Sequence, residues 1–336
     1  MTSPIEAQRL VNGFRVFQMV VAACKLQIPD LVATGPKTAD DLATSTGTHS
    51  EALLRMLRGL ASWSFFEERA DGRFAATQLS DSFRTDKPGL RNMTIMLSEE
   101  AYQAWGDLMY TLRTGKPAYE HVFGKSRFEH LAEDPEASGH FNAAMVEYST
   151  RVGKGFVAAY DFGGARTVVD VGGGNGALLI GVLQAHPEAR GILFDLAQGL
   201  AGAQEKLEEA GVADRVVLHE GSFFEGVPSG ADLYLLKSII HDWDDERSLA
   251  ILQTCRRAMN AEAKLVLVER KLPGRVENPD QDLPALMSDL NMMVVLGGKE
   301  RTTTEYRDLL AKAGLHMTRL ISTDSDFCAI EAVVAG

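Results

Sequence analysis

Residues 168–179 read VVDVGGGNGALL and carry the clearest signal of the fold. A β-branched run that contains Asp170 leads into four glycines, and an apolar segment with helical spacing begins at Ala177. A strand, a glycine-rich turn and a helix in this order open the parallel sheets of nucleotide-binding domains. The stretch therefore predicts an α/β domain with a ligand held at the turn.

Short apolar runs and helical segments alternate after residue 160, which is the pattern of a parallel sheet covered by helices. The expected strands are 166–171, 190–196, 214–221, 231–240 and 263–272, and the expected helices are 177–187, 200–212, 244–259 and 302–314. Residues 316–325 and 326–336 are typical of a hairpin that adds two strands. We therefore expect a Rossmann-like catalytic domain over residues 161–336, with a mostly parallel, seven-stranded sheet.

The first 150 residues differ from the rest because they are mostly helical and lack glycine loops. Residues 38–80 predict a helix, a turn, a second helix and a hairpin around Asp71 and Gly72, which is a winged-helix-like pattern. Such a unit can bind DNA, but its second helix offers only Arg55 and Arg58. A structural or dimerising role for this region is therefore favoured over DNA binding.

Composition narrows the function classes. The formal net charge of -12 repels polyphosphate, which disfavours nucleic acid as a partner. Cys24, Cys255 and Cys328 are widely spaced and form no CxxC motif, so neither a disulfide framework nor a zinc site is expected. No apolar run approaches the roughly 18 residues of a membrane helix, and no export signal is recognisable. We expect a cytoplasmic protein that binds no membrane.

The glycine turn could bind either of two kinds of ligand. Gly172, Gly174 and Ala177 satisfy the GxGxxG/A pattern of dinucleotide sites, and Asp195 stands where an acidic residue binds a ribose. Asp170 argues against a pyrophosphate, because its carboxylate at the mouth of the turn would repel phosphate and attract an ammonium or sulfonium group. S-adenosylmethionine has that charge pattern. A turn without any ligand is the third alternative, but four glycines cost backbone entropy without improving the packing.

The next two strands supply further expected contacts to such a cofactor. Asp195 closes the second strand, and its two carboxylate oxygens can accept both ribose hydroxyls. Ser222 and Phe223 follow the third strand, where they would flank an adenine ring, with Phe223 packed on its face. Phe223 can equally be an ordinary core residue.

Residues 236–246, LKSIIHDWDDE, end the fourth strand at the edge where open α/β sheets bind ligands. Lys237 and His241 bracket that end, and Trp243 can form a pocket wall. A lone histidine is more often structural than catalytic, but this location favours catalysis. A neutral imidazole has an ordinary pKa near 6.5 and can accept the proton of an attacking hydroxyl. His241 is therefore the expected base.

These motifs together resemble one family. The stretches VVDVGGGNG, LKSIIHDWDDE, LVLVER and GGKERTTTEYRDLLAKAG are similar to the plant-type small-molecule O-methyltransferases, the family of caffeic acid and hydroxyindole methyltransferases. The similarity is greatest to a bacterial branch that acts on polyketide, phenazine and other aromatic metabolites. It extends over nearly the whole chain, because residues 101–124 and 141–149 also match the substrate-side helices of that branch.

The resemblance implies a role for each matching residue. His241 corresponds to the family's base, and Glu269 and Glu300 correspond to the two acidic residues that flank it. The implied cofactor contacts, for S-adenosylmethionine, are Asp170, Gly172, Gly174, Asp195, Ser222, Phe223 and Lys237. The family usually has Asp at the position of Ser222, which puts the hydrogen bond to adenine in doubt. No metal is needed, because the sulfonium already activates the methyl group.

The resemblance also implies a homodimer and a substrate pocket. Residues 1–100 would form the helical dimerisation domain and residues 101–160 a substrate-side helical region, both outside the catalytic domain. The expected pocket wall consists of Trp105, Met109, Phe141, Met145, Met287, Asn291, Met292 and Met293. Ordinary core packing is an equal alternative for each of them.

Three functions fit these observations. The first is methylation of a hydroxyl on a small aromatic metabolite. The second is a family relative that keeps the cofactor but catalyses hydroxylation, decarboxylation, or N- or C-methylation. The third is a winged-helix regulator that senses a small ligand. His241 with both carboxylates favours the first, and the net charge disfavours the third.

Overall fold

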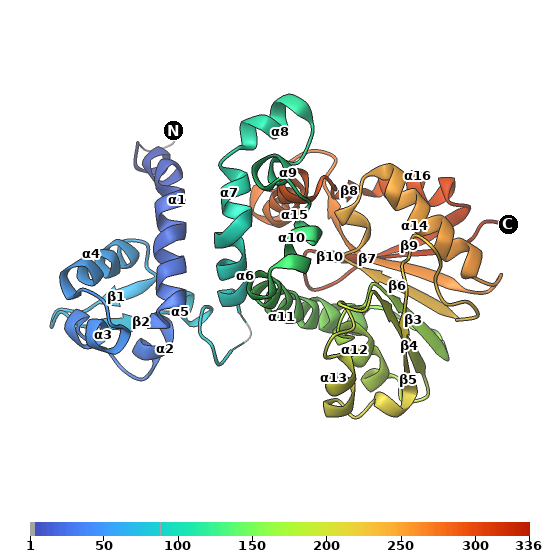
Figure 1. The fold of residues 1–336 in the computed structure, drawn as a ribbon, viewed down its shortest axis with the longest axis horizontal. Coiled ribbons are helices and arrows are strands. Elements are labelled where there is room, and N and C mark those ends of the chain that lie inside the picture. The colour runs from blue at the N-terminus through green and yellow to red at the C-terminus, as the bar shows by residue number, and fades with distance from the viewer. Residues whose placement is uncertain (1–3, 88) are drawn as a thin grey trace. The chain divides into compact units, whose positions relative to one another are not determined.

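The computed structural model describes residues 4–87 and 89–336 (Figure 1). It divides into two compact units. The first comprises the described residues up to Gln103 together with His130–Glu147, and the second comprises Ala104–Glu129 and Tyr148–Gly336. Among the described residues, no helix is long and apolar enough to cross a membrane.

The first unit is mainly helical. Its elements are α1 (Pro4–Lys25), α2 (Ile28–Ala33), α3 (Ala39–Thr46), α4 (Ser50–Ala61), β1 (Phe66–Glu68), β2 (Phe74–Ala76), α5 (Gln78–Asp81), α6 (Arg91–Met96), the π-helical turn η1 (Leu97–Ala101) and the beginnings of α7 (Tyr102–Trp105) and α11 (Pro135–Ala159). The helix, turn, helix and hairpin expected over residues 38–80 are therefore present. Thr38 caps α3 through a reciprocal capping box with Asp41, and Gly72 takes the positive φ of the hairpin turn.

The second unit is built on an eight-stranded sheet. Its strands are β3 (Thr167–Val171), β4 (Arg190–Asp195), β5 (Val216–Glu220), β6 (Leu233–Lys237), β7 (Lys264–Leu272), β8 (Arg301–Thr302), β9 (Leu315–Ser322) and β10 (Phe327–Val334). The seven longer strands follow the order β5-β4-β3-β6-β7-β10-β9, and the pairings of β10 alone are antiparallel. The predicted seven-stranded sheet is confirmed, and the two-residue β8 beside β7 is an addition that the sequence did not indicate.

Helices cover both faces of this sheet (Figure 1). One face packs against α14 (Asp245–Ala258) and α16 (Thr303–Lys312), and the other against α12 (Ala177–Ala185), α13 (Ala203–Glu209) and the end of α11. Neighbouring residues of a strand enter opposite cores, as Val168 and Val169 do in β3. The central strands β3, β6 and β7 are buried on both faces and are nearly continuous apolar runs, so the polar residues toward their carboxyl ends stand out, whereas the outer strands β5 and β9 are partly exposed.

Most of the remaining elements of the second unit lie beyond the carboxyl ends of the strands. They are α8 (Leu108–Thr114), α9 (Ala118–Phe123), the start of α10 (Arg127–Glu133), the short 3₁₀ turn η3 (Ile240–Asp242), α15 (Pro279–Asn291) and the π-helical turn η4 (Met292–Leu296), whereas the 3₁₀ turn η2 (Ala213–Arg215) precedes β5 at the opposite, amino ends of the strands. The helix α9 packs against η4, and α15 packs against β7. These contacts place α15 directly beside the strand that carries Glu269.

Candidate active site

The glycine turn after β3 has a backbone that other residues could not adopt. Gly172 and Gly174 have φ values of 68° and 56°, in the left-handed region. A Cβ atom on Gly173 would lie 2.6 Å from Cγ of Asp170, and one on Gly172 would lie 2.5 Å from Cδ1 of Ile239. The glycines therefore let the backbone close over the Asp170 side chain, which explains their concentration in the sequence.

Asp170 is a buried charge with an unused acceptor. Its side chain is 1% exposed, and no described residue donates a hydrogen bond to its Oδ2 atom. Burial raises its pKa to about 7, although the nearby Lys237 ammonium opposes the shift. A buried carboxylate of this kind is stabilised by a cation. The site therefore fits the ammonium group of an amino-acid-like ligand.

Asp195 lies at the end of β4, next to the same turn. Its Oδ2 accepts a hydrogen bond from the amide of Gly174 at 2.8 Å, and its Oδ1 accepts one from the amide of Leu196 at 2.7 Å. Each oxygen keeps a lone pair for a further donor. The carboxylate is thus fixed in place and can still receive two hydroxyl groups. Its expected contact with a ribose stays a prediction.

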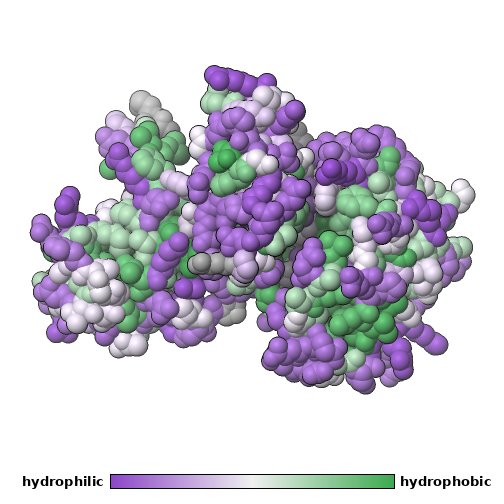
Figure 2. Space-filling model, in the orientation of Figure 1, coloured by the Kyte–Doolittle hydropathy of each residue, from purple (hydrophilic) through white to green (hydrophobic). Residues whose placement is uncertain are grey.

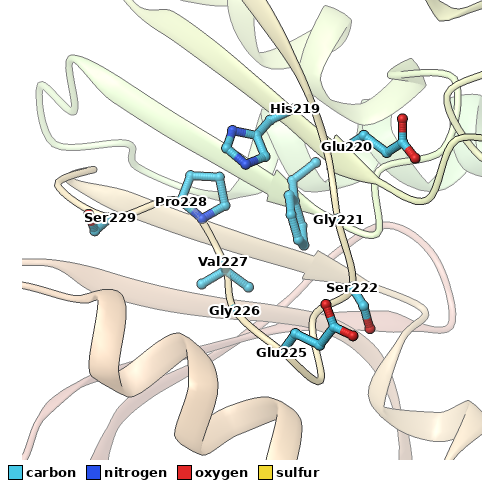
Figure 3. Close-up of a pocket in the computed structure, with 10 residues that line it drawn as sticks. His219, Glu220, Gly221, Ser222, Glu225, Gly226, Val227, Pro228 and Ser229 are labelled. Atoms are coloured by element: carbon cyan, nitrogen blue, oxygen red, sulfur yellow. The ribbon is translucent and has the colours of Figure 1, made fainter.

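Ser222 and Phe223 follow β5. Phe223 lies close to the glycine turn, since a Cβ on Gly172 would be 3.6 Å from its ring, and it makes an edge contact with Trp243. Ser222 lines a neighbouring cavity of about 390 Å³, formed by the end of β5 and the following loop. Figure 3 shows the Ser222 hydroxyl beside Glu225 in this cavity, with Pro228 next to the ring of His219. Phe223 does not line the cavity, and the expected pairing of both residues around adenine stays a prediction.

Three titratable side chains meet near the carboxyl ends of β6 and β7. His241 lies in η3, Glu269 in β7 and Glu300 immediately before β8. The Nδ1 atom of His241 is 3.1 Å from Oε1 of Glu300 and 3.2 Å from Oε2 of Glu269, while its Nε2 atom is 3.3 Å from Oδ1 of Asp242. His241, Glu269 and Glu300 are 6%, 0% and 1% exposed. The structure therefore brings together all three residues that were predicted to be catalytic.

The backbone and neighbouring side chains fix both glutamates. Oε1 of Glu269 accepts hydrogen bonds from the amides of Ile239 and Ile240, at 2.9 Å and 2.8 Å. Oε1 of Glu300 accepts one from the hydroxyl of Ser288 at 2.7 Å. Because each carboxylate is held through one oxygen, its orientation toward the imidazole is set before any substrate binds.

The pKa values in the cluster show strong coupling. Burial alone would lower the pKa of His241, but the carboxylates of Glu269 and Glu300 raise it well above its usual range. Burial raises the pKa of Glu269 to about 6. Burial alone would also raise the pKa of Glu300, but His241 and then Arg270 lower it. The arrangement stabilises a positive charge on the imidazole, as the acidic member of a catalytic triad does.

Comparison with known proteins now identifies the family. Residues 105–316 match the model of the O-methyltransferase domain, and residues 8–86 match that of the O-methyltransferase dimerisation domain. The chain belongs to the O-methyltransferase family. It is an S-adenosylmethionine-dependent O-methyltransferase with an N-terminal helical dimerisation domain.

Individual relatives agree over almost the full length. The phenazine O-methyltransferase PhzM of Lysobacter antibioticus is 42% identical, over 96% of this methyltransferase and 94% of that protein. The crystal structure of LaPhzM superposes with a TM-score of 0.91 at 41% identity, covering 99% and 100% of the two chains. The O-methyltransferase NcsB1 of neocarzinostatin biosynthesis, solved with S-adenosylmethionine and a hydroxynaphthoic acid, has a TM-score of 0.82 at 30% identity, with 95% of each chain covered.

Arg301 supports the catalytic segment of the methyltransferase, and sequence reasoning missed it. Its side chain is fully buried, and its guanidinium donates to the carbonyls of Ile240 and Trp243 at 2.9 Å and 3.0 Å. It also bonds to Oδ1 of Asp245 at 2.9 Å and to Oγ of Ser248 at 3.0 Å. The first two bonds hold the backbone on either side of His241. The only signal in the sequence was its place directly after Glu300.

The expected substrate-wall residues are only partly gathered in the second unit. The indole N–H of Trp105 donates to Oδ1 of Asn291 at 3.1 Å. Asn291 lies one helical turn after Ser288 on α15, so it shares the face that reaches Glu300. Met109 and Met287 are 53% and 47% exposed, so their thioethers are accessible, whereas Met292 is buried at 8% and Met293 is half-buried. Phe141 and Met145 lie on the part of α11 that belongs to the first unit, and their place in a pocket stays a prediction.

Proposed function

We propose that this methyltransferase methylates a hydroxyl group of a small aromatic metabolite, with His241 as the base that removes the hydroxyl proton. The observation that carries the proposal is the convergence of Glu269 and Glu300 on one nitrogen of His241. With Nδ1 turned to Glu269 and Glu300, Nε2 is the nitrogen that would face an acceptor, which would take the place beside Nε2 that Oδ1 of Asp242 now holds at 3.3 Å. Related enzymes support the substrate class, since PhzM is a phenazine O-methyltransferase.

The residues around the glycine turn would hold the cofactor. The buried carboxylate of Asp170 is suited to its ammonium group, and Asp195 to its ribose hydroxyls. Lys237 lies between Asp170 and the catalytic cluster, and burial lowers the pKa of its ammonium group. When bound, S-adenosylmethionine supplies a methyl group that its sulfonium has already activated. Catalysis by the chain then consists of aligning the acceptor oxygen and removing its proton.

His241 performs the second of these tasks. Its Nε2 atom accepts the proton of the acceptor hydroxyl, and the resulting imidazolium is stabilised by Glu269 and Glu300 at Nδ1. General base catalysis of this kind contributes roughly a hundredfold to ten-thousandfold to the rate. The clamp by Arg301 and the hydrogen bond from Ser288 to Glu300 keep the base in one position.

Trp105 and Asn291 support an acceptor of defined chemistry. An indole N–H can only donate, so its bond to Oδ1 of Asn291 turns the amide NH₂ of that residue away from the ring. That group can donate to a carbonyl or ring nitrogen of the substrate. The flexible thioethers of Met109 and Met287 suit the faces of a flat ring.

We further propose that the chain acts as a homodimer in the cytoplasm. The outer part of α1 exposes Ile5, Leu10, Val11 and Phe14, which are 62%, 85%, 73% and 55% exposed. Figure 2 shows this apolar surface in green near the free end of α1. Exposed apolar faces of this kind mark interaction surfaces. A second copy of the chain is the partner that the dimerisation domain implies for this surface. In this proposal residues 1–100 serve assembly, residues 101–160 lie beside the substrate and residues 161–336 carry out catalysis.

The three cysteines support the cytoplasmic location. They are buried and form no disulfide bonds, as a reducing compartment favours.

The experiment is incubation of the purified chain with S-adenosylmethionine and a panel of phenolic and hydroxyphenazine acceptors, followed by mass spectrometry. The expected product has gained one methyl group on oxygen. Binding of S-adenosylhomocysteine and of NAD is measured in parallel by calorimetry, with binding of the former alone expected. A hydroxylated, decarboxylated or N-methylated product, or binding of NAD alone, would refute the proposal.

A further inference from the structure

The catalytic cluster has a second geometric property. One ligand atom from each of His241, Glu269 and Glu300 lies within 4.8 Å of the other two. The two distances from Nδ1 to carboxylate oxygens are 3.1 Å and 3.2 Å. Tetrahedral zinc with bonds of about 2.0–2.1 Å has ligand-to-ligand distances of about 3.3 Å. The two distances from Nδ1 therefore already match the spacing that a tetrahedral zinc ion requires, while a carboxylate oxygen of each glutamate lies within 4.8 Å of one from the other.

The cluster also contains carboxylate oxygens without hydrogen bonds. Nδ1 of His241 carries at most one proton and cannot satisfy two carboxylates. Among the described residues, the Oε2 atoms of Glu269 and Glu300 are buried and have no hydrogen-bond partner. Oε2 of Glu269 is the atom that lies 3.2 Å from Nδ1, so it points into the cluster. A single ion at the centre would satisfy all three groups at once.

The surroundings resemble the outer shell of a metal site. Ligating carboxylates in such sites are usually held by hydrogen bonds through their other oxygen. Here the amides of Ile239 and Ile240 hold Oε1 of Glu269 and leave its Oε2 facing Nδ1, whereas Ser288 holds Glu300 through Oε1, the same oxygen that lies 3.1 Å from Nδ1. The charge also fits once zinc displaces the proton that the carboxylates stabilise on His241, since a neutral imidazole with two carboxylates carries two negative charges. Arg270, 3.6 Å from Glu300, offsets part of that charge and limits the affinity.

We propose that His241, Glu269 and Glu300 form a binding site for a divalent transition-metal ion, best matched by Zn²⁺, that inhibits the enzyme. An ion bound to Nδ1 through its lone pair leaves the proton of a neutral imidazole on Nε2. Nε2 then has no lone pair with which to accept the proton of a hydroxyl group. Zinc would therefore switch off the base without occupying the cofactor site. The binding is independent of the proposed function, whereas the inhibition rests on it.

The test is calorimetric titration of the full-length protein with ZnCl₂ after treatment with a chelator. The expected result is one site per chain that is lost in His241→Ala and weakened at least roughly tenfold in Glu300→Gln. His121→Ala is the matched control, because His121 lies 2.7 Å from Asp107 in an exposed pair that also could attract zinc. The control variant should bind zinc like the wild type. MgCl₂ should not bind, because magnesium prefers an all-oxygen site.

X-ray absorption at the zinc edge supplies a readout that does not depend on activity, with one imidazole and oxygen ligands expected. Glu300→Gln keeps the test decisive if His241→Ala does not fold. Absence of a site, or a site lost in His121→Ala and kept in Glu300→Gln, would overturn the proposal. If zinc binds with the expected variant pattern but leaves methylation unchanged, the site stands and the role of His241 as the base fails.

Discussion

Replacement of Arg301 tests how the base is held. Arg301→Met keeps most of the length of the side chain but removes every hydrogen bond of the guanidinium. The carbonyls of Ile240 and Trp243, on either side of His241, would lose their charged donor and would share the single hydroxyl proton of Ser248, whose oxygen lies 3.1 Å and 3.2 Å from them. Asp245 would lose an ion pair, but its side chain is 60% exposed and becomes hydrated instead. The loss of hydrogen bonds therefore affects mainly the buried segment that carries His241.

The expected loss of stability can be worked out from these hydrogen bonds. A buried acceptor left without a donor costs about 1–3 kcal/mol. The one proton of the Ser248 hydroxyl can serve only one of the two carbonyls, so the expected loss of stability is about 1–3 kcal/mol. A loss of about 2 kcal/mol lowers the thermal midpoint of a unit of this size by roughly 6 °C. Arg301→Lys keeps the charge but not the planar fork, and it should recover only part of this loss.

Two measurements separate the expected effects. Thermal unfolding followed by circular dichroism should show the lower midpoint, and turnover should fall more than affinity for S-adenosylhomocysteine, because the clamp acts on the His241 segment. Arg275→Met is the control, since Arg275 is 83% exposed in its surface pair with Glu277 and its loss should be nearly neutral. A midpoint and a turnover for Arg301→Met within error of the wild type would refute this reasoning.

Three further predictions concern other parts of the chain. Glu331 is buried, and although burial alone would raise its pKa, hydrogen bonds from Arg319, Thr318 and Tyr160 lower it from 4.5 to about 2. The ionised carboxylate therefore stabilises the fold above pH 4.5 by at most about 3 kcal/mol, less where solvent screens it, and this contribution is lost as the pH falls toward 2. Urea unfolding should show that Glu331→Gln is least stable relative to the wild type at neutral pH. A difference that does not change with pH would count against this explanation. Asp170→Asn should weaken S-adenosylhomocysteine binding by roughly 10–100-fold in calorimetry. The ligand-free variant should be at least as stable as the wild type, because the carboxylate that it removes is buried without a hydrogen-bond partner on Oδ2. Unchanged affinity would show that Asp170 does not contact the ligand. Leu10→Asp should convert the dimer to a monomer in sedimentation experiments, since Leu10 is 85% exposed on α1, and an unchanged dimer would place the interface elsewhere.

Local patterns in the sequence predicted most of the fold. The expected strand 166–171 is β3 (Thr167–Val171), and the expected helix 302–314 is α16 (Thr303–Lys312), which a reciprocal capping box of Thr302 and Glu305 begins. These elements are decided by neighbouring residues, through apolar periodicity and hydrogen bonds three positions apart. The helix expected over 200–212 is shorter, at Ala203–Glu209, because the chain takes a positive φ at Gly202 before it and at Gly211 after it.

The details of the site were harder to predict, because they depend on residues far apart in the chain. Glu300 lies 59 positions from His241, and only the family resemblance assigned the two to one cluster. Arg301 has the local pattern of an exposed arginine before a helix, and its burial follows from partners in η3 and α14. The bond between Trp105 and Asn291 spans 186 positions, so spacing could not reveal it.

The most direct test of the whole account is the turnover of His241→Ala, measured with the best acceptor from the panel and with cofactor affinity followed by calorimetry. His241 lies beyond the carboxyl end of β6, and the buried Asp170 at the glycine turn supplies the expected charge contact with the cofactor. The variant should therefore bind S-adenosylhomocysteine like the wild type and lose roughly a hundredfold to ten-thousandfold in turnover. Undiminished turnover with intact binding would show that the hydroxyl proton leaves by another route and would contradict the account.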